Sequence, residues 1–196
     1  MRLTLLPVGM IVAIISVLLS IATLAFAQHP GNLQFDDAER RIMRLSPSAF
    51  SEIPINIVRE LQRRGCTIPQ TVYSKKPHNV IRGYFARPGQ TDWAILCSVK
   101  GVSTILVFGS GSEKNPAEIA TLEDRIFLQG ISPDKTGYSR AITPVGKDFI
   151  MRHYDAYGGE KPPPTDHQGI DDAFLEKASV VWYFYDGKWM KLTGAD

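Results

Sequence analysis

The N-terminal segment decides which part of this chain folds, because Arg2 is the only charged residue among the first 27. Residues 10–21 are almost wholly aliphatic, and the segment ends in the Ala-x-Ala pattern of a signal peptidase site at 25–27. The sequence therefore predicts a signal peptide over 1–27 and a periplasmic or secreted mature chain. The apolar run is also long enough to span a bilayer, so an uncleaved anchor is the alternative, and membrane contact is expected only through this segment.

The remaining chain is electrically balanced. Loss of Arg2 lowers the net charge of +2 to +1, which is too even to predict a nucleic-acid partner. Residues 28–46 are polar with mixed charges, and they predict a solvated leader that is mobile or carries a short helix over 36–45. Residues 47–196 are numerous enough to bury a full core, so we expect a single globular domain there.

Cys66 and Cys97 are the only two cysteines of the chain. An even pair in an oxidising compartment is usually bridged, so the sequence predicts a disulfide between them. Two buried free thiols, or a catalytic thiolate beside His78 or His153, are the alternatives. Cys97 lies within an apolar strand pattern in which a thiol is inert, and this argues against catalysis.

Short β-rich runs separated by turn residues dominate the chain after residue 80. Three consecutive runs over 80–108 predict a meander. An Asp-Gly turn at 186–187 predicts a C-terminal hairpin from runs over 180–185 and 188–192. We also expect strands over 126–128 and 149–154, with loop or edge strand over 132–145.

Two helices are expected within the domain. The first covers 55–64, where apolar residues recur at helical spacing between Pro54 and Gly65. The second covers 171–178, because acidic residues suit the positive N-terminal end of a helix. Together with a possible leader helix, these elements predict an α+β domain with a mostly antiparallel sheet and two or three helices.

Residues 81–85 read IRGYF, and residues 89–96 read GQTDWAIL. This segment resembles an FG-GAP or VCBS-type repeat, in which a strand, a calcium loop and a second strand follow one another. The loop between the strands, 86–91, contains no carboxylate, and calcium needs six to eight oxygen ligands. The resemblance therefore implies a shared hairpin without calcium, in which Asp92 caps the turn. More broadly, residues 54–97 resemble small exported bacterial proteins of unassigned function, which implies an envelope setting and no chemistry.

Imidazole and carboxylate groups are densest between residues 153 and 176. His153, Asp166, His167 and Asp171 could hold zinc or another divalent ion and support a metal-dependent hydrolase. No H-E-x-x-H or calcium-loop spacing organises them, so a solvated loop is the simpler interpretation and no cofactor is expected.

Aromatic residues gather in the C-terminal hairpin. Strand alternation places Tyr183 and Tyr185 on the face opposite Trp182, and one of the two faces must pack on the core. An exposed tyrosine face, with Trp189 nearby, could stack on a sugar or a peptide, although tyrosines are also ordinary strand formers. The leading hypothesis is an exported, non-enzymatic domain that binds a protein, peptide or glycan at the cell envelope through this face and the proline-rich loop at 158–169. The metal-dependent hydrolase is the alternative.

Overall fold

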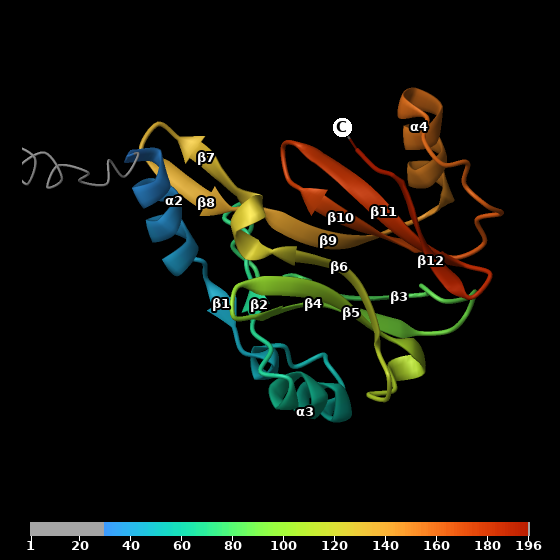
Figure 1. Cartoon of the computed structure of the whole chain (residues 1–196). Helices are drawn as coiled ribbons and strands as arrows, with labels where there is room; N and C mark the ends of the chain where they lie inside the picture. Colours follow the sequence, from blue (N-terminus) through green and yellow to red (C-terminus); the bar gives the residue numbers. More distant parts are fainter. Residues whose placement is uncertain (1–29, 196) are drawn as a thin grey trace, which may run out of the picture. The chain divides into compact units, whose positions relative to one another are not determined.

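The computed structural model describes residues 30–195, and the expected signal peptide lies outside them. Residues 34–195 belong to one compact unit, which carries the fold. This unit is an α+β structure with mostly antiparallel sheets, as predicted (Figure 1). Residues 34–46 belong to this unit, and two residues of the segment, Ala38 and Ile42, are buried in it.

The first sheet has the order β3-β4-β5-β6, so each strand pairs with its neighbour in sequence. The strands are β3 (Val80–Gly83), β4 (Asp92–Val99), β5 (Val102–Phe108) and β6 (Ala117–Glu123). This confirms the predicted meander and adds β6 to it. The strand β4 is almost completely buried because both faces of the sheet are covered.

One face of this sheet is covered by α3 (Ile55–Arg63), which follows the short helix η1 (Pro47–Ala49). Ile57, Val58 and Leu61 form the buried stripe of α3 and pack with residues of β4 and β5. The helix spans the predicted residues, and the spacing of its apolar positions explains why it forms.

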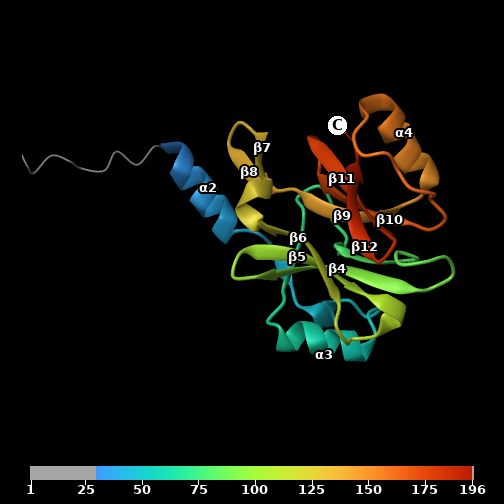
Figure 2. The ribbon, with the colours of Figure 1, turned by 45° about the vertical axis from the view of Figure 1, so that its right-hand side comes forward.

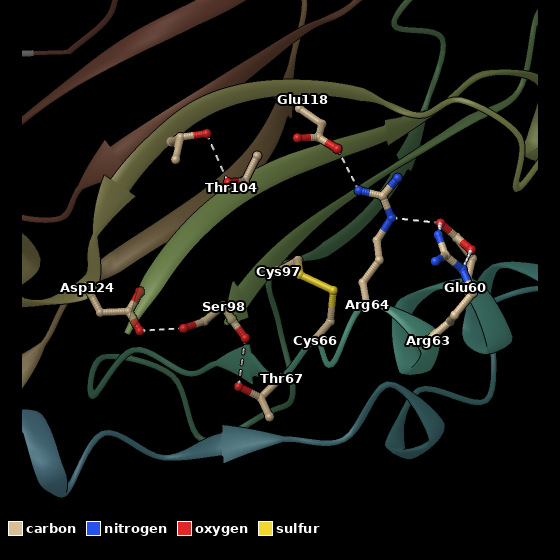
Figure 3. Close-up of a disulfide and its surroundings, with 11 residues drawn as sticks. Glu60, Arg63, Arg64, Cys66, Thr67, Cys97, Ser98, Thr104, Glu118 and Asp124 are labelled. Carbon is tan, nitrogen blue, oxygen red and sulfur yellow. Dashed lines mark hydrogen bonds and ion pairs between the residues drawn. A yellow bond between two sulfur atoms is a disulfide. The ribbon is translucent and has the colours of Figure 1, made fainter. Parts of the chain in front are cut away.

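The disulfide between Cys66 and Cys97 lies on this face, where it joins the segment after α3 to β4 (Figure 3). It confirms the predicted pairing. Next to it, Thr67 and Ser98 exchange two backbone hydrogen bonds of 3.0 and 2.8 Å. The strands β1 (Arg44–Leu45) and β2 (Ile68–Pro69) pair beside this point.

The second sheet has the order β12-β11-β10-β9. Its strands are β9 (Arg140–Val145), β10 (Gly169–Phe174), β11 (Ala178–Tyr185) and β12 (Lys188–Thr193). The β11–β12 turn contains Asp186 and Gly187 at φ values of 48° and 75°, which confirms the predicted hairpin. The helix α4 (Lys147–Tyr157) covers one face, where Ile150, Val181 and Tyr183 are fully buried.

The two sheets share a hydrophobic core between α3 and α4 (Figures 1 and 2). Leu96 and Ile105 of the first sheet pack in it with Ile142 and Ile170 of the second. The buried side chain of Asn79 ties the sheets at one edge: its amide donates to the carbonyls of Pro69 and Arg140, and its oxygen accepts from the N–H of Ile142. The resulting layers are helix, sheet, sheet and helix.

The rest of the unit packs beside these layers. The hairpin β7 (Leu128–Ser132) and β8 (Lys135–Tyr138) follows the short helix η3 (Asp124–Phe127). A hydrophobic cluster forms here, in which Ala38 and Ile42 pack against Phe127, Leu128 and Tyr138. Ala38 belongs to α2 (Pro30–Arg40), which overlaps the expected leader helix. A further short helix, η2 (Gly109–Gly111), follows β5.

Three sequence-based assignments are wrong. Of the strand expected over 126–128, Ile126 and Phe127 lie in the short helix η3, and only Leu128 lies in a strand, β7. Residues 149–154 lie in α4 and not in a strand; Gly158 ends this helix at φ 73°, donating its N–H to Tyr154. Residues 171–174 lie in β10 and not in a helix. In the strand, Asp171 and Asp172 point to opposite faces of the sheet. On its face, Asp172 forms an ion pair with the buried Arg140.

Candidate functional site

A groove of about 630 Å³ lies between the C-terminal end of α2, the 70–77 segment and β8. Its floor is built from buried residues of three segments of the chain, Ile42, Thr71 and Tyr138 among them. Met43 and Val72 also line it and are 65% and 42% exposed. Ligand sites are commonly apolar hollows of this size with a few polar groups, and we define these residues and their rim as the basic groove.

Positive charge borders the basic groove. Arg41, Lys75, Lys76 and Lys135 line it against one carboxylate, Asp134. Arg41 forms an ion pair with Asp37, whereas the three lysines make no ion pair within residues 30–195. The chain as a whole has a net charge of only +2, so this concentration of cations is local and favours an anionic ligand.

The wall formed by residues 70–78 is held in one conformation by its own hydrogen bonds. The Gln70 side chain accepts the N–H of His78 and donates to its carbonyl. The Thr71 N–H donates to Nε2 of His78 at 2.6 Å, and Nδ1 of the same ring lies 3.0 Å from the carbonyl oxygen of Lys76. Such closed local bonding fixes the loop that carries the lysines.

The opposite wall is the outer edge of β8. The carbonyl of Tyr138 faces away from β7 and accepts the N–H of Val72. In an antiparallel pair this orientation recurs at every second residue, so the N–H and C=O of Thr136 also face the groove. Neither group has a backbone partner outside the hairpin among the described residues. The groove therefore combines an apolar floor, cations and free peptide groups.

Two of the predicted metal ligands, Asp166 and His167, contact each other. Their other contacts hold the loop that contains them against β11. His167 Nδ1 lies 2.6 Å from Asp166 Oδ1 and 3.0 Å from the Tyr183 hydroxyl, and Nε2 lies 2.9 Å from the carbonyl of Phe184. Both ring nitrogens are thus occupied by protein partners. The hydrogen bond from His167 also lowers the pKa of Asp166.

His153 and Asp171 lie elsewhere, on α4 and β10. His153 Nδ1 contacts the carbonyl of Phe149, one turn earlier in the helix. Burial raises the pKa of Asp171, and a hydrogen bond with Ser179 offsets part of this rise. Within residues 30–195, no three His, Cys, Asp or Glu side chains are arranged to hold a metal ion.

The pKa of Asp171 leads to a testable prediction on stability. A carboxyl whose pKa is raised by folding contributes stability below its unfolded pKa and loses this contribution as the pH rises through the folded pKa. The variant Asp171→Asn removes this titration, so its melting temperature should rise relative to the wild type between pH 3 and pH 7. A constant difference across this range would show that Asp171 does not titrate differently in the folded protein.

The predicted tyrosine face is wrong for Tyr183, because α4 covers that side of β11 and leaves the side chain 0% exposed. Tyr185 is 40% exposed at the hairpin turn. Trp189 is partly buried and packs on Phe184 with ring centroids 5.4 Å apart. Binding through Tyr185 or Trp189 stays a prediction. The two side chains lie on opposite faces of the hairpin, because Trp189 pairs with Phe184 and Tyr185 pairs with Lys188.

Asp92 caps its turn as predicted. One carboxylate oxygen accepts the N–H groups of Phe85 and Ala86, and the other accepts from Ser110 and the Gln90 side chain. Because four N–H donors occupy both oxygens, this carboxylate is committed to holding the hairpin.

The comparisons with known proteins add no relative: no family model, no curated protein and no solved structure matches the chain. Among the residues that the structure describes, none of the helices has the length and apolar character needed to cross a bilayer.

Sequence analysis did not identify the basic groove. Its cations come from the residue that follows α2, from the 70–77 segment and from β8, which are far apart in sequence. The adjacent Lys75 and Lys76, followed by Pro77, were the local signal of an exposed cationic turn. The apolar residues Met43 and Val72 gave no sign of a shared surface.

Proposed function

We propose that this protein is an exported binding domain, periplasmic or secreted, which captures an acidic, extended peptide segment of an envelope partner in the basic groove. The observation that carries this proposal is the combination of an apolar floor with lysines on its rim. Carboxylates of the partner would meet Lys75, Lys76 and Lys135, while an apolar side chain between them would cover Ile42 and Met43.

The free edge of β8 supports a peptide as the ligand. An extended chain can add to an open strand edge through main-chain hydrogen bonds, while its alternate side chains supply specificity. Thr136 offers one N–H and one C=O at this edge. Glycan recognition relies more on stacking aromatics, and Tyr138 at the groove floor is only 1% exposed.

Export is supported by the disulfide, because such bonds persist in oxidising compartments. The charge-free N-terminal run of the sequence agrees with this setting. Mass spectrometry of the secreted chain would show whether it begins at Gln28.

A labelled peptide of alternating glutamate and valine tests the proposal. Fluorescence anisotropy should show binding that weakens as salt rises from about 50 to 500 mM, because the contacts are charged and exposed. Reversal of two rim charges, Lys75→Glu with Lys76→Glu, should weaken binding at least about tenfold.

The matched control reverses two exposed lysines outside the groove, Lys114→Glu with Lys188→Glu, and keeps the same net charge. It should bind the peptide like the wild type. Equal losses in both double variants would assign the effect to net charge and contradict a groove-specific site. A lysine–valine peptide that binds equally well would exclude recognition of acidic groups.

A further inference from the structure

A second hollow lies on the face of the second sheet that α4 only partly covers. Its volume is about 430 Å³, and it shares no lining residue with the groove. Asp171, Ala173 and Ser179 contribute to its floor from β10 and β11. Phe149 of α4 forms one wall, and the β10–β11 turn with Ala195 completes the lining. We call it the Asp171 cavity.

Strand alternation explains why these three side chains share the cavity. Asp171 pairs with Val181 and Ala173 pairs with Ser179, and Val181 packs under α4. Directly paired residues lie on the same face of a sheet, so the carboxyl of Asp171 is on the α4 side. The small side chains of Ala173 and Ser179 leave the space above the sheet open.

The carboxyl of Asp171 carries an unused acceptor. The residue is 8% exposed, and its Oδ1 is buried without a hydrogen-bond partner among the described residues. A buried polar atom without a partner costs free energy, and such atoms are rare in folded proteins. Asp172 of the same strand differs in this respect, because Arg140 donates hydrogen bonds to both of its carboxylate oxygens.

The charges around the cavity favour a cation. Asp171 and Glu176 are acidic and Lys177 is the one basic residue of the lining, while Phe149, Ala173 and Leu175 supply apolar surface. Outside the lining, the charge of Asp172 is balanced by its ion pair with Arg140, and His153 of α4 adds positive charge only when protonated. With no metal-holding arrangement among residues 30–195, the expected cation is organic.

We propose that the Asp171 cavity binds a small primary ammonium group on an apolar stem, which donates a hydrogen bond to the carboxylate of Asp171. The apolar stem lies against Phe149 and Ala173. A free small amine and the N-terminal ammonium of a peptide both carry such a group. The experiment below distinguishes these two sources.

Benzylammonium is the first probe, and benzyl alcohol is its uncharged counterpart of similar shape. Amide shifts in ¹H–¹⁵N spectra of the purified protein should localise benzylammonium to residues 171–179 and yield its affinity. Because a charge-assisted hydrogen bond is stronger than a neutral one, benzyl alcohol should bind roughly tenfold or more weakly. A dipeptide with a free N-terminal phenylalanine, compared with its N-acetyl form, tests the peptide source.

Asp171→Asn should reduce benzylammonium affinity by roughly tenfold or more, since it removes the charge from a side chain of the same shape. Asp155→Asn is the matched control, because this exposed residue of α4 carries the same charge outside the cavity. Ala173→Leu fills the cavity and leaves the carboxyl in place, so it should abolish binding even if Asp171→Asn fails to fold. Equal affinity in wild type and Ala173→Leu, absence of benzylammonium binding, or equal binding of benzyl alcohol would overturn the proposal.

Discussion

Replacement of the buried Arg140 by methionine should lower the free energy of unfolding by about 3 to 5 kcal/mol, the usual cost of breaking a buried ion pair. Arg140 is 0% exposed and binds both carboxylate oxygens of Asp172 at 2.8 Å. Its guanidinium also donates to the carbonyls of Ala120 and Ser103 and lies 4.5 Å above the Phe127 ring. The variant would leave Asp172 charged and unpaired between the two sheets.

Urea unfolding of the oxidised protein provides the measurement. The double variant Arg140→Met with Asp172→Leu is the informative control, because it removes the stranded carboxylate together with its partner. It should be more stable than Arg140→Met alone. A loss below about 1 kcal/mol for the single variant would show that the ion pair is not a main support of the contact between the sheets.

Removal of the disulfide should have a comparable effect. The two cysteines are separated by 31 residues, and closing a loop of this length stabilises a fold by about 3 to 4 kcal/mol in the chain-entropy model. We expect Cys66→Ala with Cys97→Ala to lower the free energy of unfolding by this amount. Alanine avoids placing a polar atom at two positions that are each 5% exposed.

Reduction of the wild-type protein is the corresponding control. Dithiothreitol should lower the melting temperature of the wild type towards that of the double alanine variant and leave the variant unchanged. A reducing agent that shifts both proteins equally would indicate an effect unrelated to this bond. A reduced wild type as stable as the oxidised one would contradict the expected contribution.

The elements that the sequence predicted correctly are those defined by local patterns. The helix α3 has its apolar spacing, the β11–β12 hairpin has its Asp-Gly turn, and the meander has turn residues between its strands. Asp92 was also identifiable, because its partners lie mostly in its own hairpin. In each case the deciding interactions are close in sequence.

The errors arose where a distant residue decides the structure. Two adjacent aspartates suit a helix start, but Asp172 takes its partner Arg140 from β9, which the sequence alone does not place beside it. Tyr183 is buried because α4 covers β11, and α4 was itself taken for a strand. Both hollows likewise combine side chains from separate elements, so local patterns could not reveal them.

The strand order has a consequence for how the chain acquires its structure as it is synthesised. Each four-stranded sheet is built from strands that follow one another, so the first sheet and the disulfide require no residue beyond Glu123. Such near-neighbour contacts form early, and N-terminal parts of a chain can fold first. Arg140 and Asp172 arrive only with the second sheet. A disulfide-locked first half would therefore present a preformed surface on which the second half assembles.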